Sequence, residues 1–415
     1  MGKNYFIYIF STIVVALGGS VYTFAISYFI LQETGSALYF SINAAIMSIG
    51  AIIALPISGV IVDSMNRKKI ILSFEALSAL TLLFLSLYIA FFGFNIYALF
   101  FITAVRSIIT PVIFNAFDAS MTQLFDKEHI QKTLGKISLY KTSIMFLGPI
   151  LAGIIYGFLS LQLMILIFFI MQLLSFILNI FLVFSEQKLE KAYENASFEI
   201  WFKSFSNKFI QGYQVILKSD VLKQLLVLSV VINAVGAASF GVLPETIMIK
   251  ELNFTAPQVG IVGTIFTVGS LIGSFILSKQ KIKNPLNIVK YAFIIVAMFL
   301  LSFTLPVYVE MKPIISMVYI GLIGLSMALV FQFISIPMSS YMQKTIPDEF
   351  KGRVFSINGT VGMVLMPIGT IFYGALYEKG IYFPVNLFSS IIILVTVFLT
   401  LKPFIVAKSA MEYTR

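Results

Sequence analysis

The sequence predicts an all-α membrane protein of twelve transmembrane helices, arranged as two pseudo-symmetric six-helix bundles. Composition is the first observation, since 59% of the 415 residues are hydrophobic and only 11% are charged. A soluble domain carries about 25% charged residues. Apolar runs of transmembrane length also fill most of the chain, and similar patterns of spaced residues occur in its two halves.

The predicted spans follow from the length of these apolar runs. A helix needs about 20 apolar residues to cross roughly 30 Å of hydrocarbon. Strands of an outer-membrane barrel would be about ten residues long and would alternate polar with apolar residues, which these runs do not. The first run is too long for the apolar part of a signal peptide, so it counts as the first helix. The predicted spans are 5–31, 38–62, 70–92, 95–117, 137–159, 163–184, 222–247, 257–278, 288–306, 314–340, 354–377 and 382–402.

The longest polar stretch near the middle of the chain divides it into two parts of similar size. We expect an N-terminal bundle at 1–184, a cytoplasmic amphipathic linker at 185–221 and a C-terminal bundle at 222–415. Aromatic residues around Trp201 recur at helical spacing among lysines. This segment either lies on the cytoplasmic leaflet or packs on protein.

A repeated pattern supports duplication of the bundle. Gly135-Lys136 precedes Tyr156-Gly157 at the same spacing that separates Gly352-Arg353 from Tyr373-Gly374. A proline lies inside each stretch. Two parallel repeats around a central path are an arrangement known among transporters.

The net charge of +10 reflects topology. If both termini are cytoplasmic, the inner segments hold 24 of the 28 Lys and Arg residues. This is the positive-inside bias, and it predicts a bacterial plasma-membrane protein and argues against nucleic-acid binding. The chain has no cysteine, so disulfides and thiolate metal sites are excluded. We expect no metal and no cofactor.

The most specific local pattern lies between the second and third predicted spans. Gly59, Asp63, Arg67 and Lys68 are spaced along it. Gly59 would permit a close helix contact, and Asp63 would accept hydrogen bonds at a neighbouring helix N-terminus. A plain basic loop would explain Arg67 and Lys68, but not the spaced glycine and aspartate.

Arg106 is the second signal, near the middle of the fourth predicted span, 95–117. An arginine at the bilayer centre costs about 2.5–3.5 kcal/mol or more, and such residues usually face a cavity and have a function. The alternative is an arginine neutralised by a buried structural partner.

These residues resemble the major facilitator superfamily, whose signature loop has the same spacing of glycine, aspartate and two basic residues. Asn66 and Ser64 depart from that signature. The resemblance implies that the loop latches the two halves of the transporter on the cytoplasmic side, with Asp63 near Arg353. It also implies that Asp118 joins this latch and, from drug-exporting members, that Arg106 serves proton coupling.

A further pattern resembles a motif on the fifth helix of the exporters in this superfamily. It is carried by Gly135, Gly148, Pro149 and Gly153. Pro149 frees a backbone carbonyl and the small residues allow close helix contact. Other segments, such as Val105-Arg106-Ser107-Ile108, resemble the macrolide-efflux branch.

The predicted interior holds few polar residues. Asn115, Asn233 and Gln332 are the candidates for the cavity beside Arg106, among 42 Phe and 19 Tyr. An aromatic cavity of this kind suits a bulky amphiphile. For the coupling proton we expect a buried carboxylate, with Glu245 and Glu33 as the first candidates. Glu75 is expected to be interfacial or part of the latch.

The resemblance implies a monomeric secondary active exporter of macrolide-like amphiphiles, driven by proton antiport across the bilayer. An exporter of an endogenous molecule such as a siderophore or a lysophospholipid is the alternative within the same fold. A polytopic membrane enzyme would need clustered acids, histidines or metal ligands at the interface, and only Asp126, Glu128 and His129 are grouped. A channel is disfavoured by the repeat and the lack of a filter-like loop.

Overall fold

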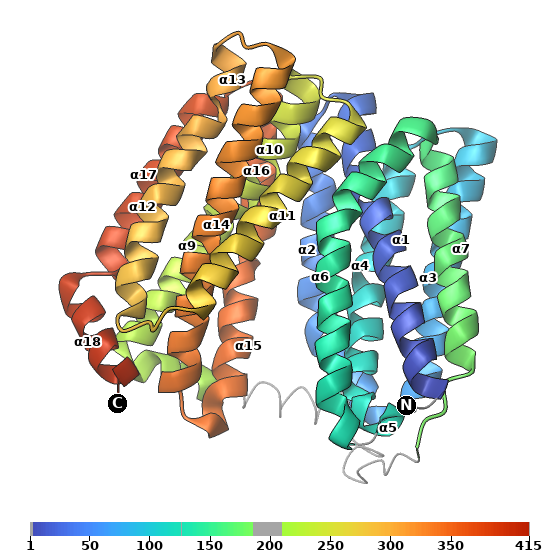
Figure 1. The fold of residues 1–415 in the computed structure, drawn as a ribbon, viewed down its shortest axis with the longest axis horizontal. Helices are drawn as coiled ribbons and strands as arrows, with labels where there is room; N and C mark the ends of the chain where they lie inside the picture. The colour runs from blue at the N-terminus through green and yellow to red at the C-terminus, as the bar shows by residue number, and fades with distance from the viewer. Residues whose placement is uncertain (1–2, 126, 186–209, 415) are drawn as a thin grey trace. The chain divides into compact units, whose positions relative to one another are not determined.

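A computed structural model describes residues 3–125, 127–185 and 210–414. Every regular element in these ranges is a helix. Eleven of the helices there are long and apolar enough to cross a membrane, and α9 (Asp220–Gly241) occupies the place of the seventh predicted span. The prediction of an all-α, twelve-helix membrane protein is therefore confirmed (Figure 1).

The chain divides into two compact units. Unit 1 comprises Met1–Glu33, Ile46–Trp201 and Thr255–Gly260, and unit 2 comprises Thr34–Ala45, Phe202–Phe254 and Ile261–Arg415. Most of the predicted linker, 186–209, lies outside the described residues, and with it the amphipathic segment around Trp201. A helix at 210–218 precedes α9.

The helices that build unit 1 end at residues suited to those positions. Asn66 caps the start of α3 by accepting a hydrogen bond from the Lys69 N–H, and Asn95 caps α4 in the same way. Gly93, at φ 77°, ends α3 in a conformation that favours glycine. The elements are α1 (Lys3–Thr34), α2 (Ala37–Ser64), α3 (Arg67–Phe92), α4 (Ile96–Ala119), α5 (Met121–Leu124), α6 (Lys127–Phe158) and α7 (Leu161–Ile180).

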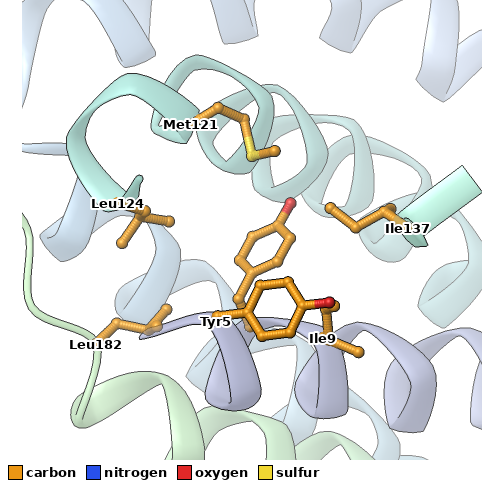
Figure 2. Close-up of a cluster of buried hydrophobic side chains, with 7 residues drawn as sticks. Tyr5, Ile9, Met121, Leu124, Ile137 and Leu182 are labelled. Atoms are coloured by element: carbon orange, nitrogen blue, oxygen red, sulfur yellow. The ribbon is translucent and has the colours of Figure 1, made fainter. Parts of the chain in front are cut away.

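One end of unit 1 is closed by a cluster of buried apolar side chains. Figure 2 shows Tyr5 and Ile9 from α1 facing Met121 and Leu124 from α5, with Leu182 beside them. The Asn4 amide fixes the same end, because it donates to the Val183 carbonyl at 2.6 Å and accepts from the Val183 N–H at 2.9 Å. The start of α1 is therefore held against the segment that follows α7.

In unit 2, three predicted spans are interrupted, and one of them, 288–306, is divided between α12 and α13 at Thr304. The predicted span 222–247 ends as a helix at Gly241 and continues as short elements, and the span 354–377 is divided between α15 and α16 just before Pro367, since proline cannot donate the helical hydrogen bond. Besides α9, the elements are α10 (Leu243–Thr246), η1 (Ile247–Glu251), α11 (Ala256–Ser278), α12 (Pro285–Phe303), α13 (Leu305–Tyr308), α14 (Pro313–Thr345), α15 (Asp348–Val364), α16 (Met366–Glu378), α17 (Tyr382–Thr400) and α18 (Pro403–Thr414).

Glycines set the closest helix contacts in unit 2. A Cβ at Gly369 on α16 would collide with the Ala234 carbonyl of α9, and one at Gly269 on α11 would collide with the Leu325 carbonyl of α14. Small residues at such crossings let membrane helices approach until their backbones touch. The α9–α16 and α11–α14 crossings therefore depend on these glycines.

Candidate functional site

The basic residues in the first turn of α3 bind helix ends within unit 1. The Arg67 guanidinium donates to the Ala119 carbonyl at 2.6 Å, at the end of α4. The Lys68 ammonium donates to the Ile180 and Leu182 carbonyls, both at 2.8 Å, at the end of α7. The last carbonyls of a helix lack partners and carry partial negative charge, so cations stabilise them. These residues thus fasten α3 to α4 and α7.

The other residues of the predicted latch are Gly59, Asp118 and Asp63. Among the described residues, open space surrounds the position that a Cβ would take at Gly59. Asp118 is exposed on the last turn of α4, one residue from the carbonyl that Arg67 binds. The side chain of Asp63 lies outside the described part of the structure.

Arg106 projects from α4 into a site formed by three other helices. Its guanidinium donates to the carbonyl and the hydroxyl of Ser78 on α3, at 3.2 and 2.9 Å. It also lies over the rings of Tyr22 on α1 and Phe168 on α7, at 5.1 and 5.0 Å from the ring centroids. Aromatic faces and neutral oxygens can stabilise a guanidinium. These contacts do not cancel its charge.

One turn away from Ser78 on the same face of α3 lies Glu75, whose side chain is only 1% exposed. Its carboxylate accepts hydrogen bonds from the Ser175 hydroxyl at 3.0 Å and from the Asn179 amide at 2.9 and 3.0 Å, both on α7. Glu75, expected to be interfacial or part of the latch, is buried against α7 within unit 1. Arg106 on α4 thus binds Ser78, one turn from Glu75 on α3, and α3 packs against both α4 and α7 (Figure 1).

The other predicted cavity residues are dispersed. The Asn115 amide on α4 donates to the Ser58 hydroxyl on α2, and the Asn233 amide on α9 turns back to the Ser229 carbonyl at 2.8 Å. The Gln332 carbonyl on α14 accepts from the Ser274 hydroxyl on α11 at 3.3 Å. Asn115 and Gln332 thus bridge helices of their own unit, whereas Asn233 bonds within α9.

The two carboxylates favoured by sequence differ in environment. Glu33, at the end of α1, is exposed. Glu245, on α10, is half-buried, and its Oε2 atom is buried without a hydrogen-bond partner among the described residues. Neither Glu33 nor Glu245 shares the Ser175 and Asn179 donors that contact Glu75. Among the described residues there is no group of three or more His, Asp or Glu side chains arranged to hold a metal ion.

The predicted fifth-helix motif lies on α6. A Cβ at Gly148 would collide with the Ser20 hydroxyl of α1, and one at Gly153 would collide with the Ala256 carbonyl in the first turn of α11. Pro149 lies inside the helix, and its carbonyl faces Gly260. Gly135, two turns from the start of α6, has open space at its Cβ position. Gly148, Pro149 and Gly153 therefore lie at close contacts between helices.

The chain is similar in sequence to one protein family and in fold to several solved structures. A sequence profile described as Major Facilitator Superfamily matches residues 8–370. Macrolide efflux protein A of Streptococcus pyogenes is 24% identical over 349 residues, which cover 84% of this chain and 82% of that protein. Among solved structures, the nucleoside transporter NupG matches with a TM-score of 0.69 at 16% identity, covering 97% of this chain and 99% of that one. A D-xylose–proton symporter matches with a TM-score of 0.69 at 12% identity, covering 96% and 97%.

Proposed function

Because this chain belongs to the Major Facilitator Superfamily, we propose that it is a secondary active exporter of hydrophobic or amphiphilic small molecules. In this proposal the two repeats, 1–184 and 222–415, expose a central site alternately to the two sides of a bacterial plasma membrane. Both termini lie in the cytoplasm, in accord with the positive-inside distribution of Lys and Arg. Proton antiport supplies the energy.

The observation that carries the proposal is the environment of Arg106. A permanent positive charge is held inside a transmembrane bundle by Ser78 and two aromatic rings, with no anionic contact among the described residues. A cation in such a place is costly. Such a residue is retained where its charge is used. The uncompensated charge can attract a carboxylate when a proton leaves, which links protonation to conformation.

The substrate class rests on two further points. The chain carries 42 Phe and 19 Tyr residues, and sites for bulky amphiphiles are lined mainly by apolar and aromatic side chains with few polar groups. The resemblance to macrolide efflux protein A selects macrolides as the first drugs to test. Siderophores and lysophospholipids form the second panel.

Uptake of a labelled macrolide by everted vesicles containing the protein tests the proposal. We expect uptake when the lumen is acidic and none after a protonophore collapses the gradient. Arg106→Ala is expected to reduce uptake to the level of empty vesicles. Uptake that is absent for every compound of both panels, with folded protein in the membrane, would contradict export of amphiphiles.

A further inference from the structure

The sequence predicts an interfacial or latch role for Glu75 and does not predict a buried carboxylate at this position. α3 begins at Arg67, so Glu75 lies eight residues further on, inside the span Arg67–Phe92. At 1.5 Å per residue this is roughly 12 Å along the helix. Ionisable residues inside transmembrane segments are rare and mark ion or proton pathways by default.

Among the described residues, the donors that contact Glu75 are neutral. They are the Ser175 hydroxyl and the Asn179 amide, and both residues are only 1% exposed. The Asn179 amide also lies 3.2 Å from the Ser175 oxygen, so the three side chains form a closed group. We call this group the Glu75 site. A buried carboxylate is usually paired with a cation, whereas this one is surrounded by groups that cannot supply charge.

The Glu75 site contains one hydrogen-bond acceptor that no described donor uses. The Asn179 Oδ1 atom is buried and has no donor among the described residues. A carboxyl group that takes up a proton gains one donor, and it needs one more acceptor. The amide of Asn179 can turn about its axis to present Oδ1, and the hydroxyl of Ser175 can accept as well as donate. Both protonation states of Glu75 can therefore be satisfied by the same two partners.

Few charged or titratable groups of the described residues lie around the Glu75 site. On α4, Arg106 reaches Ser78, one turn along α3 from Glu75, while Asp118 lies at the exposed end of that helix. α7, Leu161–Ile180, contains no titratable residue. Tyr22 on α1 lies beside Arg106. On α3 itself, Lys68 is bound to carbonyls at the end of α7.

We propose that Glu75, Ser175 and Asn179 form a proton-binding site inside unit 1, and that Arg106 controls its occupancy from one turn away. When the guanidinium swings from Ser78 towards Glu75, the carboxylate is stabilised and its proton leaves to water. When the guanidinium returns to Ser78, an O–H bond forms on the carboxylate with a proton taken from water. No other bond changes. The use of this step in transport rests on the proposed function, but the site itself does not.

Infrared spectroscopy of the purified, lipid-embedded protein tests the site without any substrate. A protonated carboxylic acid has a carbonyl stretch that shifts in D₂O and disappears on ionisation. We expect one such buried band to change with pH in the wild type, to be absent in Glu75→Gln, and to be unchanged in Glu310→Gln. Glu310 is the matched control because it is exposed between α13 and α14. A band that persists in Glu75→Gln would overturn the proposal.

A second variant and a comparison with the export assay complete the test. If Glu75→Gln does not fold, Ser175→Ala is used instead, and it should move the frequency of the band because a hydrogen bond to Glu75 is lost. An unmoved band would overturn the proposal, as would a band that responds to Na⁺ at constant pH, which would identify a sodium site. If the band behaves as expected but no drug moves against protons, the proposed export fails and the Glu75 site stands. If proton-driven export is found and Glu75→Gln retains both export and the band, the Glu75 site fails and the proposed function stands.

Discussion

The carboxylate of Glu378, at the end of α16, accepts a 2.7 Å hydrogen bond from the backbone N–H of Ala37, the first residue of α2. It also contacts the Leu38 N–H and lies 3.7 Å from the Lys250 ammonium. The first N–H groups of a helix lack partners and carry partial positive charge. A side chain from the far end of the chain therefore caps α2 within unit 2.

Removal of this cap should destabilise the protein. Glu378→Ala is expected to lower the free energy of unfolding by about 1 kcal/mol, in the range of other helix caps. Thermal unfolding in detergent micelles measures the change, and Glu310→Ala is the control for loss of an exposed glutamate. Equal melting temperatures for both variants would contradict the role of Glu378 as a cap.

The neighbouring lysines in the first turn of α3 offer a matched pair. Lys68 binds two carbonyls at the end of α7, whereas the side chain of Lys69 is exposed. Lys68→Ala should therefore lower stability by about 1–2 kcal/mol, since two hydrogen bonds from a charged donor are lost. Lys69→Ala should have little effect. If the two variants unfolded alike, the lysines would act only through their net charge.

Close helix crossings give a second matched pair. At Gly369 an added methyl group collides with the Ala234 carbonyl, whereas at Gly359 on α15 it meets open space. Gly369→Ala should destabilise unit 2 by about 1–3 kcal/mol through overpacking. Gly359→Ala should be neutral or slightly stabilising, because alanine has the higher helix propensity. The order of their melting temperatures checks the α9–α16 contact.

The attachment of α18 should depend on pH. Asp220 and Lys408 lie outside the predicted spans, and the Lys408 ammonium donates to Asp220 at 2.9 Å while Lys223 lies 3.1 Å from the same carboxylate. The hydrogen bond and charge of Lys408, assisted by Lys223, lower the pKa of Asp220. A lowered carboxyl pKa contributes stability that is present above the ordinary value of about 4 and is lost as pH falls through the lowered value.

Lys408 sets the upper limit of the pH range in which this attachment is stable, because its hydrogen bond with Asp220 raises the pKa of the ammonium. That contribution is present below the ordinary lysine value of about 10.4 and is lost as pH rises through the raised value. Hydrogen exchange at Pro403–Thr414, corrected for intrinsic rates, should show constant protection at neutral pH and a loss in acid. Asp220→Asn should remove this acid dependence. A wild-type profile that stays flat in acid would contradict the attachment.

The fold was predictable because hydropathy reports the length of each span directly. The predicted span 38–62 compares with α2 at Ala37–Ser64, and 382–402 compares with α17 at Tyr382–Thr400. Interruptions inside a span were not predicted, because an apolar run continues through a break such as the one before Pro367.

The candidate site was predictable only in part. Arg106 stands out in sequence because no other charge lies near it along the chain. Glu75 follows a basic loop, which suggested an interfacial residue. Its burial depends on Ser175 and Asn179, which lie 100 and 104 residues further along. No periodicity within α3 reveals those partners, so the carboxylate could be placed only by the packing of α3 on α7.

Proton movement during export tests the central proposal most directly. Everted vesicles containing the protein are acidified inside, and a pH-sensitive dye follows the lumen while macrolides are added. The account predicts that a macrolide discharges the gradient with wild-type protein and fails to do so with Arg106→Ala. A gradient that stays intact for every macrolide with folded wild-type protein, or that is discharged equally by Arg106→Ala, would contradict proton-coupled drug export through Arg106.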